Sequence, residues 1–242
     1  IVNELKDDVE FWLTINEPNV YAFKAYDAGE WPPYKKERKT SLLVMGNLLK
    51  AHYNAYHTIH KIYKNTPVKV GYAHHIAILH PYYRLNPLDN IMTYFINKVF
   101  NESFWNSIET GKIDINIPGI EGVNEAYNEK LKDSMDFIGF NYYTRWFVTA
   151  KGEQIANPNA ELTDIGWEVY PEGISEAIDI ANKYAEKRNI PIYITENGID
   201  DANDTKRKAY LISHLKKVLQ SIQNNRNIKG YIYWTLMDNF EW

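Results

Sequence analysis

The chain has 242 residues, of which 45% are hydrophobic and 24% charged, as in a soluble globular protein. Its 27 basic and 31 acidic residues leave a net charge of -4, which gives no reason to expect a nucleic-acid or membrane partner. The chain has no cysteine, which excludes disulfides and a cysteine nucleophile. No apolar stretch approaches the ~18 residues of a membrane span, and no signal-peptide pattern opens the sequence, so we expect a cytoplasmic location.

Strand and helix patterns alternate along the whole chain. Residues 11–15 predict a strand, and apolar residues spaced by three, four and seven predict a long helix over 40–64. Further along the chain we expect strands at 68–73, 135–140, 190–195 and 228–234, and helices at 88–109, 172–188 and 204–225.

This alternation predicts a parallel sheet built from βα units, and the strands are apolar on both faces, as such a sheet requires. Two architectures fit the pattern, an open doubly wound sheet and a (β/α)8 barrel. No glycine-rich phosphate loop follows any expected strand, which argues against a nucleotide-binding sheet.

The polar motifs of the sequence follow directly after expected strands. Asn16 and Glu17 follow the first strand, Glu196 follows the fourth, and Trp234 and residues 238–242 follow the fifth. Taken alone, the Asn-Glu-Pro triplet is typical of a helix start, and Glu-Asn-Gly is typical of a turn. In a barrel, however, the C-terminal ends of the strands form the active face, so both glutamates would project from the same rim.

Two carboxyl groups on one face are what glycoside cleavage requires. A retaining enzyme holds them ~5–5.5 Å apart, one as nucleophile and the other as acid and then base. The chain is also rich in aromatic residues, with 7 Trp and 19 Tyr. Most of these rings would fill a core, but flat sugar faces also stack on such rings while their O–H and N–H groups bind hydroxyls.

Together these motifs resemble those of the family 1 glycoside hydrolases, β-glucosidases and β-galactosidases built on a (β/α)8 barrel. Residues 13–18 (LTINEP) resemble the acid/base motif after the fourth strand of that family, and residues 194–198 (ITENG) resemble the nucleophile motif after the seventh. Residues 238–242 (DNFEW) resemble the sugar-binding motif after the eighth. Residues 166–173 (GWEVYPEG) and 139–145 (GFNYYTR) resemble two further family segments, and the sequence of the second segment is most similar to the archaeal branch.

The resemblance implies an α/β fold, a partial (β/α)8 barrel of about five βα units among eight, with residues 1–242 as a single catalytic fragment. The chain opens without Met inside an expected helix and stops on Trp242. We therefore expect it to lack the first three βα units, which supply a Gln, an Arg and a His to the site of the family, and the last helix. It would be a fragment of a longer protein, half of a split enzyme or a decayed remnant. We expect it either to form a homo-oligomer or to bind a complementing barrel fragment.

The resemblance also assigns roles to individual residues. Glu17 is the expected acid/base, Glu196 the nucleophile, and Tyr143 the donor of a hydrogen bond to Glu196. The expected substrate-binding residues are Asn16 at the sugar 2-hydroxyl, Glu241 at O4 and O6, Trp242 at O3, Trp234 beneath the sugar, Trp167 in the aglycone site, and Asn141. Two alternatives stay open, namely that Trp234 is part of the core and that Trp167 only packs its own loop.

No carboxylate stands at metal-ligand spacing from the histidines, so we expect no metal and no cofactor. One group of histidines follows the second strand, and the other is expected on the flank of the first long helix. These are His74, His75 and His80, and His52, His57 and His60.

The leading hypothesis is a retaining exo-β-glycosidase that acts on a small β-glycoside or oligosaccharide through a covalent glycosyl-enzyme intermediate. Glu241 can satisfy either epimer at C4, so the residues do not distinguish glucose from galactose. The alternative is a catalytically impaired fragment or remnant that needs a partner chain or only binds sugar. A third hypothesis, an endo-acting cellulase with the same two glutamates, is disfavoured because Glu241 and Trp242 would close the end of the sugar site.

Overall fold

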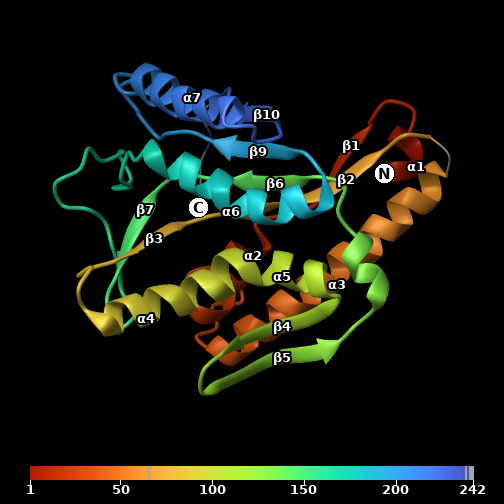
Figure 1. Ribbon diagram of the computed structural model, residues 1–242, viewed down its shortest axis with the longest axis horizontal. Coiled ribbons are helices and arrows are strands. Elements are labelled where there is room, and N and C mark those ends of the chain that lie inside the picture. The colour runs from red at the N-terminus through yellow and green to blue at the C-terminus, as the bar shows by residue number, and fades with distance from the viewer. Residues whose placement is uncertain (65, 238, 240–242) are drawn as a thin grey trace. The chain divides into compact units, whose positions relative to one another are not determined.

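The computed structural model describes residues 1–64, 66–237 and 239 (Figure 1). The chain divides into two compact units, and each is described here by itself. Ile1–His75 and Phe95–Gly139 form the first unit, and Ile76–Tyr94 and Phe140–Trp242 form the second. That residues 1–242 form a single catalytic domain stays a prediction.

The first unit is built around a strand–helix–strand segment. β1 (Phe11–Asn16) pairs in parallel with β2 (Lys69–His75), with Phe11 opposite Lys69. Between the two strands lie α2 (Pro18–Ala22), η1 (Phe23–Asp27) and the long helix α3 (Arg38–Tyr63), which confirms the helix expected over 40–64. A short helix α1 (Val2–Leu5) precedes β1. The buried cluster of Tyr56, Ile59, Tyr63 and Val70 joins α3 to β2.

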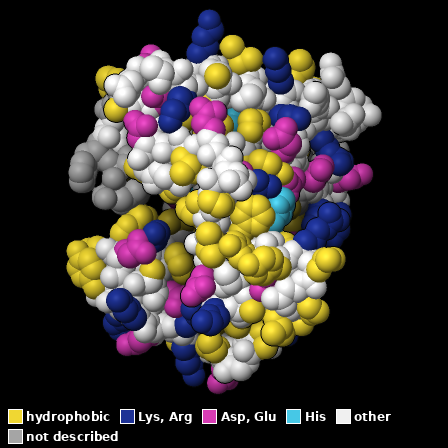
Figure 2. All heavy atoms as spheres, turned by 90° about the vertical axis from the view of Figure 1, so that its left-hand side faces the viewer, with side chains coloured by type: hydrophobic (Ala, Val, Ile, Leu, Met, Phe, Trp, Pro, Cys, Tyr) yellow, Lys and Arg dark blue, Asp and Glu magenta, His cyan; other side chains and the backbone are white. Residues whose placement is uncertain are grey.

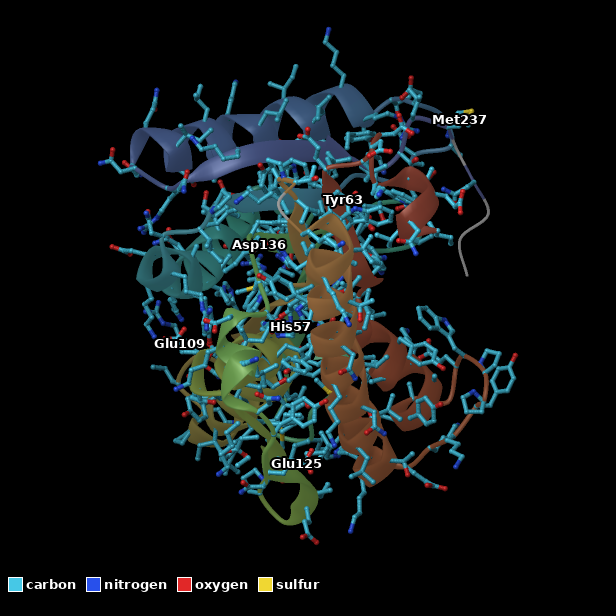
Figure 3. The ribbon with its side chains drawn as sticks, turned by 90° about the vertical axis from the view of Figure 1, so that its right-hand side faces the viewer. His57, Tyr63, Glu109, Glu125, Asp136 and Met237 are labelled. Atoms are coloured by element: carbon cyan, nitrogen blue, oxygen red, sulfur yellow. The ribbon has the colours of Figure 1, made fainter. Side chains whose placement is uncertain are left out.

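A carboxylate fixes the end of α3 to the strands. Asp136 accepts a 2.7 Å hydrogen bond from the Tyr56 hydroxyl and a 2.8 Å bond from the Val70 N–H, and its Oδ2 lies 2.8 Å from His60 Nε2. Figure 3 shows Asp136 beside the end of α3 that carries Tyr63. Because Asp136 lies two residues before β6 (Ile138–Asn141), these bonds fix the start of that strand relative to β2.

The segment expected as one helix over 88–109 consists of three consecutive helical pieces. They are α4 (Pro87–Ile96), the π-helical turn η2 (Asn97–Glu102) and α5 (Ser103–Thr110), after which Gly111 takes the left-handed conformation with φ 74°. The antiparallel strands β4 (Lys112–Ile117) and β5 (Ile120–Ala126) follow, and the one-turn 3-10 helix η3 (Glu129–Asp133) comes after them. This hairpin was not predicted from the sequence.

The second unit contains two groups of strands. β3 (Ile78–Pro81) pairs in parallel with β7 (Arg145–Val148), and β7 pairs antiparallel with β8 (Gln154–Ile155). β9 (Ile192–Asn197) and β10 (Ile228–Tyr233) form a parallel pair. The expected strands at 190–195 and 228–234 are therefore confirmed, whereas β3, β7 and β8 were not predicted.

Two helices accompany β9 and β10 in this unit. α6 (Glu172–Arg188) has the predicted bounds, and its predicted apolar stripe, which includes Ile174 and Ile178, is buried. α7 (Arg207–Gln223) packs against α6. Of its expected stripe Val218 is buried, but Leu215, Leu219 and Ile222 are exposed, so the amphipathic pattern predicted the helix correctly and its buried face only in part.

The surface near the start of α4 is rich in large apolar side chains. Tyr83, Leu85, Leu88 and Ile91 are all exposed. Figure 2, which faces the side of the molecule where α4 begins, shows hydrophobic side chains among the charged ones at the surface. None of the helices in the described part of the chain has the length and apolar character needed to cross a membrane.

Candidate active site

Glu17 stands at the turn between β1 and α2. Its backbone has φ 47° and ψ 55°, in the left-handed region that residues other than glycine rarely adopt. Its N–H donates a 2.8 Å hydrogen bond to the Ala73 carbonyl of the neighbouring strand, and Pro18 begins α2. Glu17 is the N-cap residue, yet its side chain makes no capping bond, so the carboxyl group is not used to start the helix.

A histidine at the end of β2 contacts this carboxyl group. His75 Nδ1 lies 2.8 Å from Glu17 Oε1, and both side chains are largely buried. Asn19 donates hydrogen bonds to the His75 carbonyl at 2.8 Å and to the Phe100 carbonyl at 3.1 Å, which fixes the end of β2 against the first turn of α2. No role was expected for His75, although its place just after an expected strand is a signal that could have identified it.

Two other histidines of this unit are buried and neutral. Burial lowers the pKa of His52 to about 4 and that of His74 to about 3. Because the Ser134 carbonyl can only accept, His52 Nε2 donates to it at 2.6 Å, and Nδ1 accepts from the Thr14 hydroxyl at 2.7 Å. The interpretation of His52 as a flank residue of the long helix was therefore wrong, since a buried hydrogen bond at each ring nitrogen compensates for its burial.

Glu196 lies near the end of β9 in the second unit. The Tyr143 hydroxyl donates a 2.6 Å hydrogen bond to Glu196 Oε2, and the Tyr142 N–H donates a 3.0 Å bond to the Glu196 carbonyl. The resemblance predicted the Tyr143 contact. The two neighbours of Glu196 in the sequence are also fixed. Thr195 donates to the buried Asn141 Oδ1 at 2.5 Å, and the Asn197 amide donates to the Tyr142 carbonyl at 2.7 Å.

Aromatic and glycine residues complete the surroundings of Glu196. The rings of Tyr143 and Trp167 meet edge to face, with centroids 5.6 Å apart and an interplanar angle of 62°. The backbone N–H of Trp234 donates a 3.0 Å hydrogen bond to the Asn197 carbonyl. A Cβ at Gly198 would lie 1.7 Å from the Trp234 carbonyl oxygen, so glycine is needed here because β10 approaches closely, not because of a turn conformation.

The predicted site residues fall into three groups. Glu17 and the exposed Asn16 belong to the first unit. The second unit brings Tyr143, Glu196 and Trp167 together, with Asn141 and Trp234 attached to the residues on either side of Glu196. Glu241 and Trp242 lie outside the described residues. The separation of ~5–5.5 Å between the two glutamate carboxyls stays a prediction.

Comparison with known proteins places these motifs in a family. The model of glycosyl hydrolase family 1 matches residues 1–242. A β-galactosidase of Sulfolobus acidocaldarius is 32% identical over 256 residues, which cover 99% of this chain and 49% of the relative. A β-galactosidase of Pyrococcus woesei is 31% identical over 100% of this chain and 52% of its own length. The chain thus spans about half the length of these curated relatives.

Solved structures give the same result. A β-glycosidase from Pyrococcus horikoshii superposes with a TM-score of 0.85 and 34% identity, over 100% of this chain and 55% of that one. A family 1 β-glucosidase from Thermotoga maritima gives a TM-score of 0.82 and 30% identity, and the match covers 100% of this chain and 58% of that one. These neighbours are (β/α)8 barrels, and the expected fold class, a partial barrel of parallel strands and helices, is confirmed.

Proposed function

The chain belongs to glycosyl hydrolase family 1, and on that premise we propose that its protein is a retaining exo-β-glycosidase. The proposed substrates are small β-glycosides or oligosaccharides with a terminal β-linked glucose or galactose. Relatives named β-galactosidase and β-glucosidase support this substrate class. A β-glucosidase from Thermotoga maritima solved in complex with glucoimidazole supports binding of a sugar-like ring.

In the proposed mechanism, a Glu196 carboxylate oxygen attacks the anomeric carbon while Glu17 protonates the departing glycosidic oxygen. A covalent glycosyl ester of Glu196 results. Glu17, now ionised, takes a proton from water, and the water oxygen displaces Glu196 from the anomeric carbon. Two inversions leave the sugar with its original β configuration.

The observation that best supports this proposal is the 2.6 Å hydrogen bond from Tyr143 to Glu196 Oε2. The bond occupies Oε2 and limits rotation of the carboxyl group. Asn16, Asn141, Trp167, Trp234, Glu241 and Trp242 are the proposed sugar contacts. Of these, Trp167 packs on Tyr143, whose hydroxyl donates to the carboxyl group that would bear the sugar.

A 2-deoxy-2-fluoro β-glycoside with a good leaving group tests this proposal, because the fluorine slows breakdown of the intermediate. We expect peptide mapping to find the label on Glu196 and to find none in the Glu196→Gln variant. Glu17→Gln is the matched control, since it keeps the nucleophile and should still be labelled by a substrate whose leaving group needs no acid. A label on another residue, or an α-configured first product, would contradict the mechanism.

A second candidate is a fragment that needs a partner chain to act. The chain spans about half the length of its relatives, and apolar side chains on its strands are exposed, among them Phe11 at 49%, Leu13 at 45% and Ile232 at 54%. An open barrel would also admit water, which weakens the electrostatic contacts of a site. We propose that a polypeptide carrying the remaining βα units, or a second copy of this chain, covers these strands.

This candidate is tested by measuring hydrolysis of a chromogenic β-glucoside with the 242-residue chain alone and then with a polypeptide carrying the first three βα units of a relative. We expect little or no turnover by the chain alone and a rise on addition of the second polypeptide. Full activity of the chain alone would contradict the need for a partner. Sugar binding without turnover in either mixture would favour a non-catalytic remnant.

A further inference from the structure

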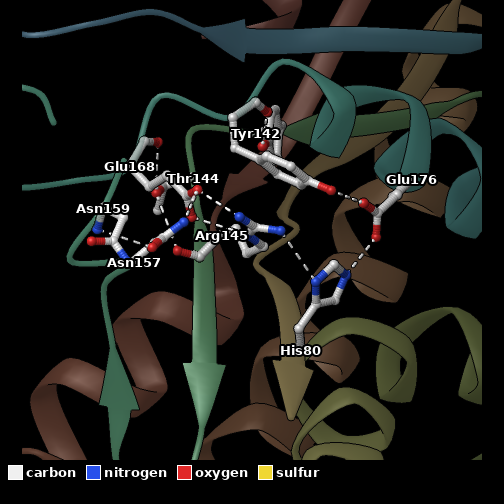
Figure 4. Close-up of polar contacts among 9 residues, drawn as sticks. His80, Tyr142, Thr144, Arg145, Asn157, Asn159, Glu168 and Glu176 are labelled. Atoms are coloured by element: carbon white, nitrogen blue, oxygen red, sulfur yellow. Dashed lines mark hydrogen bonds and ion pairs between the residues drawn. The ribbon is translucent and has the colours of Figure 1, made fainter. Parts of the chain in front are cut away.

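Arg145 and Glu168 form a two-pronged ion pair in the second unit. Arg145 Nε donates to Glu168 Oε2 at 2.9 Å, and Nη2 donates to Oε1 at 2.6 Å. The two side chains are 14% and 3% exposed, and the Asn157 amide donates a further 3.1 Å bond to Oε1. Figure 4 shows the Arg145 guanidinium between Glu168 and His80. Because a planar fork facing a carboxylate fixes distance and orientation together, this pair is rigid.

The opposite side of Arg145 is also held. Its guanidinium carbon lies 3.7 Å from the centre of the Tyr170 ring, and Nη1 lies 3.4 Å from His80 Nδ1. His80 Nε2 lies 2.9 Å from Glu176, which also accepts a 2.8 Å bond from the Tyr170 hydroxyl. A single neutral tautomer of His80, with its proton on Nε2, satisfies both neighbours. The contacts close a ring through Arg145, His80, Glu176 and Tyr170.

The ion pair joins the two chain segments that carry Tyr143 and Trp167. Arg145 comes two residues after Tyr143, and Glu168 comes directly after Trp167. The Thr144 hydroxyl donates a 3.0 Å bond to the Glu168 carbonyl and so adds a second link between the same segments. Across this junction Trp167 packs edge to face on Tyr143, whose hydroxyl reaches Glu196.

We propose that Arg145 and Glu168 are positioning residues, whose ion pair holds Trp167 against Tyr143 and thereby holds the Tyr143 hydroxyl on Glu196. The catalytic meaning of this arrangement rests on the proposed function, in which Glu196 is the nucleophile and Trp167 contacts the aglycone. The geometric part does not depend on it. A buried ion pair adds little net stability compared with an apolar pair of the same size, so we assign this pair a role in geometry and not in stability.

The geometric part is tested on the 242-residue chain with 3-fluorotyrosine incorporated at position 143 and observed by 19F NMR. Glu196→Gln and Trp167→Phe calibrate how the resonance responds to loss of each neighbour. Arg145→Lys keeps the charge but loses the fork and the stacking on Tyr170, and Glu168→Gln keeps the shape but loses the charge. We expect one resonance in the unsubstituted chain. In Arg145→Lys and Glu168→Gln we expect a second resonance, or a resonance shifted toward the chemical shifts seen in Glu196→Gln and Trp167→Phe.

Arg226→Lys is the matched control, because Arg226 pairs with Asp179 on the surface of the same unit and away from Tyr143. It should leave the resonance unchanged. Circular dichroism and urea unfolding establish which variants are folded, and if Glu168→Gln is not, Glu168→Asp replaces it. An unchanged Tyr143 resonance in folded Arg145→Lys and folded Glu168 variants would overturn the proposal, even if both were less stable, since that is the result of a purely structural pair.

The effect on catalysis is measured separately, as kcat and KM, with whichever preparation of the protein hydrolyses β-glucosides. Displacement of the nucleophile by ~1 Å can cost about 10²-fold in rate, so kcat should fall by about that factor at most. KM should rise more for an aryl β-glucoside than for methyl β-glucoside, because Trp167 would contact the aryl group. A uniform fall in activity without this difference would contradict the role of Trp167. If no preparation turns over, the proposed function fails, while the 19F result still decides the positioning.

Discussion

The Tyr143 hydroxyl and Glu196 Oε2 are 2.6 Å apart although the residues are 53 positions apart in the sequence. The contact arises because Tyr143 follows β6 and Glu196 lies near the end of β9, and the Tyr142 N–H bonds to the Glu196 carbonyl. A hydrogen bond to a charged group contributes about 1.5–3 kcal/mol. In the proposed mechanism this bond keeps one carboxylate oxygen occupied and the other directed at the sugar.

Tyr143→Phe removes the hydroxyl and keeps the ring that packs on Trp167. We expect kcat/KM toward an aryl β-glucoside to fall about 10- to 100-fold, the equivalent of one such hydrogen bond, with most of the loss in kcat. Steady-state kinetics in a preparation that hydrolyses β-glucosides measure this. Tyr53→Phe is the control, since its hydroxyl accepts an exposed hydrogen bond from Asn128 in the first unit. A change of less than twofold at Tyr143 would argue against a role for the bond in catalysis.

Gly198→Ala tests the close approach of β10 to the end of β9. The new Cβ would overlap the Trp234 carbonyl oxygen, and a backbone atom cannot rotate away, so the end of β10 must move. We expect a loss of about 1–3 kcal/mol in the free energy of unfolding and altered tryptophan emission. Gly119→Ala is the comparison, because its φ of 81° is unfavourable for alanine but no atom lies within 4 Å. Altered emission in both variants would show that the overlap is not the cause.

Asp136→Asn tests the anchor between α3 and the strands. Asn retains one acceptor oxygen, so its NH2 group must face either the Tyr56 hydroxyl, which donates to Asp136 Oδ1, or the Val70 N–H, which donates to Oδ2. The free energy of unfolding should fall by about 1–3 kcal/mol, measured by urea titration. Asp179→Asn breaks the exposed pair with Arg226 and should cost no more than about 1 kcal/mol. Equal losses in the two variants would contradict the anchoring role.

The buried histidines predict loss of stability in mild acid. Burial holds the pKa of His52 at about 4, below its ordinary value of 6.5, so between these values the unfolded chain binds a proton and the folded chain does not. Stability therefore falls as pH falls through this window, by at most about 1.4 kcal/mol per pH unit for each such histidine. Burial also lowers the pKa of His74 and of His214, so these residues change the stability in the same direction.

Urea unfolding at pH 7, 6 and 5 measures this slope, and His52→Gln should lower stability at pH 7 but flatten the slope. An unchanged slope in His52→Gln would show that the proton uptake lies elsewhere.

Sequence patterns located the long helices and the strands that precede the polar motifs, because these signals are local. α6 matches its predicted range, and the expected strand ends at 15, 140, 195 and 234 lie within two residues of the observed ends at 16, 141, 197 and 233. The β4–β5 hairpin was missed although Ile113, Ile115 and Ile117 alternate with polar residues before Pro118 and Gly119, a pattern typical of a strand and a turn. An expectation of strictly alternating strands and helices concealed it.

Other features depend on pairing between distant residues and could not be read from local patterns. β3 and β7 have four residues each, and they are defined by pairing with each other, 67 positions apart. The contact of His75 with Glu17 depends on the parallel register of β1 and β2, which brings Asn16 opposite Ala73. The buried hydrogen bond of His52 Nε2 depends on the Ser134 carbonyl, 82 positions along the chain.

The left-handed backbone at Glu17 has a consequence for the selection of variants. A residue with a side chain is less stable in this conformation than glycine by roughly 1–2 kcal/mol, and the Glu17 side chain provides no capping bond in return. Glu17→Gly would thus relax the turn while it removes the proposed acid. A library screened only for yield or heat resistance would enrich glycine at this position, and the winners would be well-folded proteins that have lost turnover.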